Sequence, residues 1–126
     1  ESNGMTFCSG SLASNIHNNI YKIFNKFKDK INFIHLRNVK IEKDKKSFYE
    51  SNHLCGDVDF VKLIKLILKE EKRRSKNQKV EIPMRPDHGH ALLDDQKKKT
   101  FNPGYTAIGR LMGLSELRGI IKALEN

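Results

Sequence analysis

The sequence predicts a parallel α/β fold in which short buried strands alternate with amphipathic helices. Apolar runs of strand length are each followed by a segment whose apolar residues recur at helical spacing. Each of these runs also ends in polar side chains that can take part in chemistry. In parallel α/β proteins the carboxyl ends of the strands are where ligands and catalytic groups gather. We therefore expect three strand–helix units whose strand ends form one site.

The first unit is predicted to hold a strand at residues 4–8 and a helix within residues 16–27. Apolar side chains recur at helical spacing from Ile16 to Phe27, with lysines on the opposite side. Asp29 and Lys30 then interrupt this stripe.

The second unit is predicted to hold a strand at residues 31–39 and a helix that opens at residues 56–59. The strand starts as a nearly continuous apolar run, as expected when helices cover a parallel sheet. Residues 40–57 between them form a long polar loop, and loops of this length in compact domains are usually functional or disordered.

The third unit is predicted to hold a strand at residues 80–84, a loop at residues 85–105 and a final helical region. Pro86 favours an extended backbone before it and Gly89 allows a turn, so the loop begins close to the strand end. We expect the final helix to be broken near Gly113, with Ser115 as the cap of its last segment.

Three predicted strand ends offer side chains that bind metals, namely Cys8, His35 and Asp87. A thiolate, an imidazole and a carboxylate suit Fe²⁺, Mn²⁺, Co²⁺ or Zn²⁺ better than Ca²⁺ or Mg²⁺. Taken singly, each residue has a commoner interpretation: a buried thiol, a hydrogen-bonded core histidine and a turn or cap residue.

The charge and cysteine content bear on partners and location. The net charge is +9, from 24 basic and 15 acidic residues, but neither a pattern of interleaved aromatic residues nor a nucleic-acid motif accompanies the scattered lysines. This favours a solvated basic surface and no nucleic-acid partner. Two cysteines make no disulfide framework, and no long apolar run or signal sequence is present. We therefore expect a cytoplasmic protein with no membrane partner.

Five motifs together resemble the mannonate dehydratase family, in the same order and with similar spacing. They are FCSGSL (7–12), HLRNVK (35–40), HLCGDVD (53–59), RPDHGH (85–90) and NPGYTAIGRL (102–111). The resemblance covers essentially the whole chain but only the carboxy-terminal part of that family.

The resemblance implies a fold and a size. Members are xylose-isomerase-like TIM barrels, and a complete (β/α)₈ barrel typically needs about 250 residues. The 126 residues would then supply about three βα units, so residues 1–126 are expected to form a single partial domain, a fragment of the barrel. The missing amino-terminal half would be its partner, and a homodimer stays open.

The resemblance also implies an activity, the metal-dependent dehydration of D-mannonate to 2-keto-3-deoxy-D-gluconate in hexuronate (glucuronate) catabolism. The cofactor would be Mn²⁺ or Fe²⁺. The implied metal ligands are Cys8, His35 and Asp87, and a further histidine ligand of the family has no counterpart here. The residues expected to transfer protons are His88 and Tyr105, in either order. Those expected to bind the substrate are Arg37, Arg85 and His53, with His90 orienting a ligand.

The sequence departs from the family at Cys55, where an aspartate is usual, and at Ala13, where a glycine is usual. The fragment alone is expected to be inactive. Two alternatives stay open, a metal-dependent sugar isomerase-type barrel and a non-catalytic basic remnant.

Overall fold

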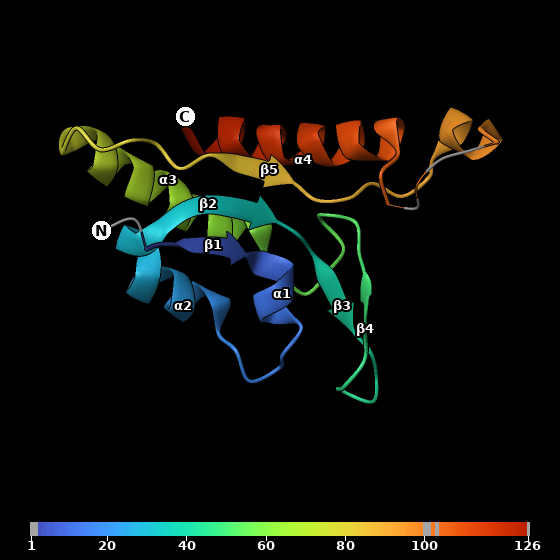
Figure 1. The fold of residues 1–126 in the computed structure, drawn as a ribbon, viewed down its shortest axis with the longest axis horizontal. Coiled ribbons are helices and arrows are strands. Elements are labelled where there is room, and N and C mark those ends of the chain that lie inside the picture. Colours follow the sequence, from blue (N-terminus) through green and yellow to red (C-terminus); the bar gives the residue numbers. More distant parts are fainter. Residues whose placement is uncertain (1–2, 100–101, 103, 126) are drawn as a thin grey trace.

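A three-stranded parallel sheet forms the centre of the computed structural model, which describes residues 3–99, 102 and 104–125. Its strands are β1 (Met5–Cys8), β2 (Ile31–Leu36) and β5 (Met84–Pro86), in the order β1-β2-β5. Both pairs are parallel, so all three carboxyl ends point the same way (Figure 1). The predicted parallel α/β class is confirmed. Pro103, in the predicted loop and the NPGYTAIGRL motif, lies outside the described residues.

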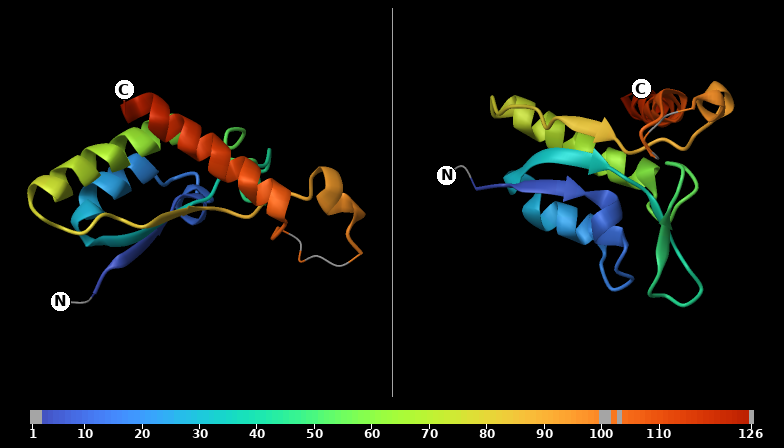
Figure 2. Two further views of the ribbon diagram at one scale, coloured as in Figure 1. Left: turned by 90° about the horizontal axis from the view of Figure 1, so that it is seen from above. Right: turned by 45° about the vertical axis from the view of Figure 1, so that its right-hand side comes forward.

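Helices cover one face of this sheet. The α-helices are α1 (Ser9–Ala13), α2 (Ile20–Phe27), α3 (Phe60–Lys76) and α4 (Ala107–Glu125), and two short 3₁₀ helices lie at η1 (Lys28–Lys30) and η2 (Leu93–Lys97). Figure 2 shows α2 and α3 on the same side of the sheet, with α4 crossing obliquely beside β5. Within the described part of the chain, no helix covers the opposite face.

The core lies between the sheet and these helices. The ring of Phe7 meets that of Phe24 edge to face, with the centroids 5.4 Å apart. Burying an aromatic side chain of this size contributes about 1.5–3 kcal/mol. The side chains of α3 that face the sheet are Leu63, Ile64 and Ile67, which are fully buried.

The structure corrects the first two predicted units. The first helix begins at Ile20, because the Asn19 side chain accepts a hydrogen bond from the Lys22 N–H and caps it, and Ile16 is 47% exposed. The second strand stops at Leu36. Part of the expected polar loop is instead an antiparallel hairpin of β3 (Val39–Ile41) and β4 (Phe48–Glu50).

The third unit also differs from the prediction. The strand lies at 84–86 rather than 80–84, because β2 pairs with residues up to Pro86 and Val80 is 82% exposed. The final helix α4 is not broken at Gly113. Ser115 is no cap, because its hydroxyl donates to the Leu111 carbonyl at 2.8 Å, one turn back in the same helix.

No helix among the described residues is long and apolar enough to cross a membrane.

Candidate active site

The carboxyl ends of the three strands bring predicted site residues next to one another. Cys8 lies opposite His35 in the β1–β2 pair, and His35 lies opposite Arg85 in the β2–β5 pair. Side chains of directly paired residues point to the same face of a sheet. Asp87 follows β5 directly. Cys8, His35 and Asp87 therefore lie next to one another at the carboxyl ends, and their binding of one metal ion stays a prediction.

His35 lies between the other two side chains. The Cys8 Sγ is 3.4 Å from His35 Nδ1, and the Asp87 Oδ1 is 2.9 Å from His35 Nε2. The Ser11 hydroxyl donates to the Cys8 Sγ at 3.1 Å. Although they face each other, His35 Nε2 and Asp87 Oδ1 are buried atoms that make no well-directed hydrogen bond.

This donor set fits a divalent cation chemically. Two ligands bound about 2.0–2.2 Å from one cation lie roughly 3 Å from each other, and His35 Nε2 and Asp87 Oδ1 are 2.9 Å apart. Burial lowers the pKa of His35, against the opposing effect of Asp87, and a metal ligand must be a neutral imidazole. Cys8 faces the other nitrogen of His35, and the described residues hold no three such side chains already gathered around one cation position.

The two predicted carboxylate-binding arginines differ in their partners. The Arg37 guanidinium is engaged by Glu50 of β4, which accepts from Nε at 3.0 Å and also from Nη2. This pairing raises the pKa of Arg37. Arg85 is exposed beside His35, and no carboxylate among the described residues pairs with it. Of these two arginines, Arg85 is therefore the one whose guanidinium is available to bind an anion.

His88 and Tyr105 lie together at the mouth of the cluster. Their ring centroids are 4.4 Å apart, and the His88 Nδ1 is 3.6 Å from Asp87 Oδ1. Tyr105 is 54% exposed. Both predicted proton-transfer groups thus border the metal-ligand candidates and stay open to solvent.

His53 has a different setting from the substrate contact expected from sequence. It is 3% exposed, stacks on Phe60 with centroids 5.9 Å apart, and its Nε2 accepts a hydrogen bond from the Asp87 backbone N–H at 3.1 Å. Burial lowers the pKa of His53. Its contacts are with the protein backbone next to a predicted ligand.

The loop after β5 packs tightly on the start of α4. A Cβ on Gly89 would lie 2.2 Å from the Arg110 nitrogen, so only glycine permits this approach. The Thr106 hydroxyl donates to the His90 carbonyl at 2.7 Å. The His90 side chain is exposed, and no hydrogen bond in the described part of the chain joins it to a predicted ligand. Its expected orienting role stays a prediction.

Several residues that shape the site were not identified from sequence. Ser9, fully buried, donates to the Arg37 carbonyl at 2.6 Å and ties the ends of β1 and β2 together. Asp95, also buried, accepts from the Ile108 N–H at 2.9 Å and so caps α4 from a distant turn. Asp95 lies twelve residues before α4, so no local capping signal linked the two. Ser9 stands in the FCSGSL motif, but nothing in the sequence indicated its contact with the end of β2.

Gly113 allows α4 to approach the His53 ring, and replacing it tests that packing. A Cβ there would lie 2.3 Å from His53 Cε1, so Gly113→Ala is expected to destabilise the chain by about 1–3 kcal/mol through overpacking. Gly119 on the same helix has nothing within 4 Å. Gly119→Ala should therefore stabilise the chain, by up to about 1 kcal/mol, through better helix propensity. Urea unfolding of both variants checks the pair, and equal shifts would contradict the packing.

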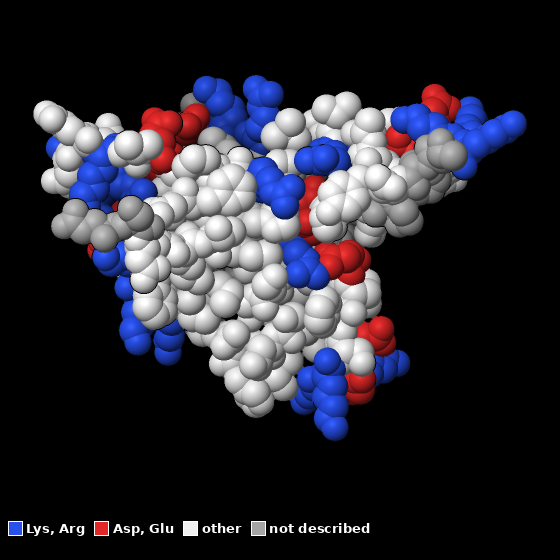
Figure 3. Space-filling model, in the orientation of Figure 1, with Lys and Arg blue, Asp and Glu red and all other residues white. Residues whose placement is uncertain are grey.

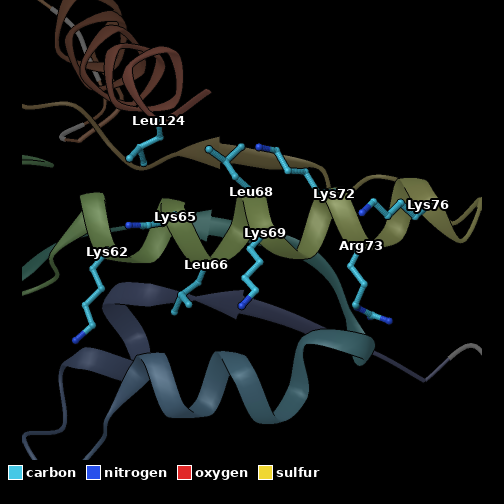
Figure 4. A pocket seen from close by; sticks show the side chains of 9 residues that line it. All are labelled: Lys62, Lys65, Leu66, Leu68, Lys69, Lys72, Arg73, Lys76 and Leu124. Atoms are coloured by element: carbon cyan, nitrogen blue, oxygen red, sulfur yellow. The ribbon is translucent and has the colours of Figure 1, made fainter. Parts of the chain in front are cut away.

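The uncovered face of the sheet and the outside of α3 differ in charge. Figure 3 shows the uncovered face largely without charge, with basic and acidic atoms side by side toward the strand ends. On the other side lies a groove of about 680 Å³ along α3 (Figure 4). Basic side chains dominate its lining, and no described lining residue is a histidine, cysteine or acid. The imidazoles, thiol and carboxylate expected to take part in the chemistry gather instead at the strand ends.

The fold and this cluster define a parallel α/β chain whose strand ends carry a thiol, an imidazole and a carboxylate. The chain belongs to the D-mannonate dehydratase (UxuA) family, whose family model matches residues 1–126. It is 48% identical over 124 residues to mannonate dehydratase 2 of Agrobacterium fabrum and 47% identical over 123 residues to mannonate dehydratase of Chromohalobacter salexigens.

Each of these two alignments covers 98% of this chain and 31% of the relative, so the chain spans about a third of the length of the curated relatives it matches. A crystal structure of mannonate dehydratase from Streptococcus suis serotype 2 is also similar. Its TM-score is 0.78 at 30% identity, covering 97% of this chain and 32% of that one. The family resemblance seen in the five motifs is confirmed.

Proposed function

We propose that this chain supplies the carboxy-terminal third of a metal-dependent mannonate dehydratase barrel and carries most of its catalytic groups. The observation that carries the proposal is the buried pair His35 Nε2 and Asp87 Oδ1, which face each other at 2.9 Å beside Cys8 without a well-directed hydrogen bond. A cation between two such atoms would satisfy both of them better than their mutual contact does. Family membership makes D-mannonate the substrate to test.

Dehydration of a sugar acid of this kind removes the proton on C2 and expels the hydroxyl on C3. Both steps place negative charge near the carboxylate, so an acid, a base and an electrostatic partner are needed. A divalent cation, Mn²⁺ or Fe²⁺, held by Cys8, His35 and Asp87 would supply Lewis-acid stabilisation of that charge. His88 and Tyr105 border the cluster and share the two proton transfers.

Binding of the substrate carboxylate falls to Arg85 in this proposal. Its guanidinium projects next to His35 and offers paired donors for a carboxylate. Arg37 is paired with Glu50 and serves mainly to hold the β3–β4 hairpin against the cluster. The uncovered face of the sheet, which carries Cys8 and His35, would face the interior of a closed barrel in a cytoplasmic enzyme.

The isolated chain is expected to form no product, because no described residue forms a wall over the sheet face that carries Cys8 and His35 and one family ligand has no counterpart. The 126-residue protein, supplied with Mn²⁺ or Fe²⁺ and D-mannonate, should give no 2-keto-3-deoxy-D-gluconate above a metal-only control. Chromatographic measurement of that product checks this. Robust turnover by the chain alone, as monomer or homo-oligomer, would mean that the residues named above suffice.

A further inference from the structure

We infer that His53 is a positioning residue that fixes Asp87 by bridging the ends of β2 and β5. The inference rests on the proposed function, because it takes Asp87 as a metal ligand. It gives His53 no contact with the substrate.

The bridge stands where the parallel ladder stops. The last paired residues of β2 and β5 are Leu36 and Pro86, and Asp87 comes next. The Asp87 N–H donates to His53 Nε2 at 3.1 Å. The Leu36 backbone also acts on the His53 ring, because its hydrogen-bonding effect partly opposes the lowering of the His53 pKa by burial. A neutral imidazole has one donor and one acceptor nitrogen. Since Nε2 accepts, Nδ1 carries the proton, and the ring takes the place of a direct bond between the two strand ends.

The ring is held so that it cannot turn toward the uncovered face. It stacks on Phe60 at an interplanar angle of 30°, and Gly113 of α4 lies against its other atoms. The Asn38 side chain donates to the His53 carbonyl at 2.6 Å and fixes the backbone of the same residue. The His53 side chain is 3% exposed, so it has no access to a substrate. Its role is therefore limited to the groups that it contacts.

The consequence concerns the two ligand candidates that flank the bridge. His35 immediately precedes Leu36, and Asp87 is the residue whose N–H the ring accepts. By fixing both backbones, His53 sets the separation between His35 Nε2 and Asp87 Oδ1. Groups that orient a ligand in this way typically change metal affinity about 10–100-fold when they are removed.

The test is a Co²⁺ titration of the 126-residue chain, followed by the absorption of thiolate-bound Co²⁺. His53→Leu keeps the bulk but has no polar atoms, so its Co²⁺ affinity should fall about 10–100-fold. His53→Gln has one donor and one acceptor and should recover most of the loss. Phe60→Leu is the comparison variant, because it removes one support of the ring but keeps both imidazole nitrogens, and it should lower the Co²⁺ affinity much less than His53→Leu.

The outcomes separate a failure of the His53 bridge from a failure of the metal site on which it rests. Equal Co²⁺ affinities for wild type and His53→Leu would overturn the bridge but leave the metal site. So would a loss in Phe60→Leu as large as that in His53→Leu, since general loosening would then explain both. If wild type binds Co²⁺ no better than Cys8→Ala, the metal site itself fails and the bridge with it.

A second measurement applies even if His53→Leu does not fold. Long-range ¹H–¹⁵N correlation spectra of the wild-type chain should show His53 as the neutral tautomer protonated on Nδ1. The tautomer protonated on Nε2 would overturn the bridge, because Nε2 would then be unable to accept from Asp87.

Discussion

Asp87→Ala is expected to remove bound metal and product formation together when residues 1–126 are placed in a complete barrel. A suitable protein is a chimera in which this chain replaces the matching 31% of the Agrobacterium fabrum relative. Deleting the carboxylate leaves the buried His35 Nε2 without its facing atom, and so removes part of the coordination shell. Metal per subunit, measured beside kcat, should fall to background, as should turnover.

Tyr105→Phe in the same chimera should separate catalysis from metal binding. Loss of a general acid or base typically lowers the rate by about 10²–10⁴-fold, and the metal content should stay unchanged. Tyr49→Phe is a matched control, because Tyr49 lies on the β3–β4 hairpin and is 54% exposed, as is Tyr105. Near-normal kcat for Tyr105→Phe would withdraw its catalytic role.

Glu70→Gln is expected to cause the largest loss of stability. The Glu70 carboxylate is 2% exposed and accepts from Arg73 Nε at 2.8 Å and from Arg74 Nε at 3.1 Å. Arg74 in turn donates to the Ile31 carbonyl at 2.9 Å, which ties α3 to the start of β2. Removing one partner of a buried ion pair costs about 3–5 kcal/mol.

Glu71→Gln is the control for this change. Burial raises the pKa of Glu71, and a neutral amide oxygen can still accept from the Ile82 N–H, as Glu71 does at 3.0 Å. Urea unfolding at neutral pH should show a large loss for Glu70→Gln and little change for Glu71→Gln. Equal losses would contradict the assigned roles.

The contribution of Glu70 to the free energy of unfolding should also disappear in acid. Hydrogen bonds from Arg73 hold the pKa of Glu70 below its ordinary value of 4.5, with burial opposing and Arg74 assisting. A group whose pKa is lowered by folding stabilises above the unfolded pKa and loses that effect as pH falls through the folded value. The difference between wild type and Glu70→Gln should therefore shrink below pH 4.5.

The residues of the site were easier to predict from sequence than the contacts that hold them. Cys8, His35 and Asp87 each end or follow an apolar run, and parallel strands bring such ends together whatever their exact register. Glu50 was missed as the partner of Arg37 because their pairing depends on a hairpin within a charged stretch. Periodicity gives little signal for two three-residue strands.

Tertiary packing also overrode two local signals. Gly113 looked like a helix breaker, yet α4 continues through it because the helix must lie close to the His53 ring. The apolar run from Val80 suggested a strand, but the bounds of β5 follow from its partner, which pairs with it only from Met84 to Pro86. In both cases the deciding neighbour lies far away in the sequence.

Product formation by the wild-type chimera tests the central claim most directly. With Mn²⁺ or Fe²⁺ and D-mannonate, the chimera should release 2-keto-3-deoxy-D-gluconate, while the chimera carrying Asp87→Ala should not. A folded, metal-loaded wild-type chimera that leaves D-mannonate unchanged would contradict the proposal that this chain carries the catalytic groups of a mannonate dehydratase.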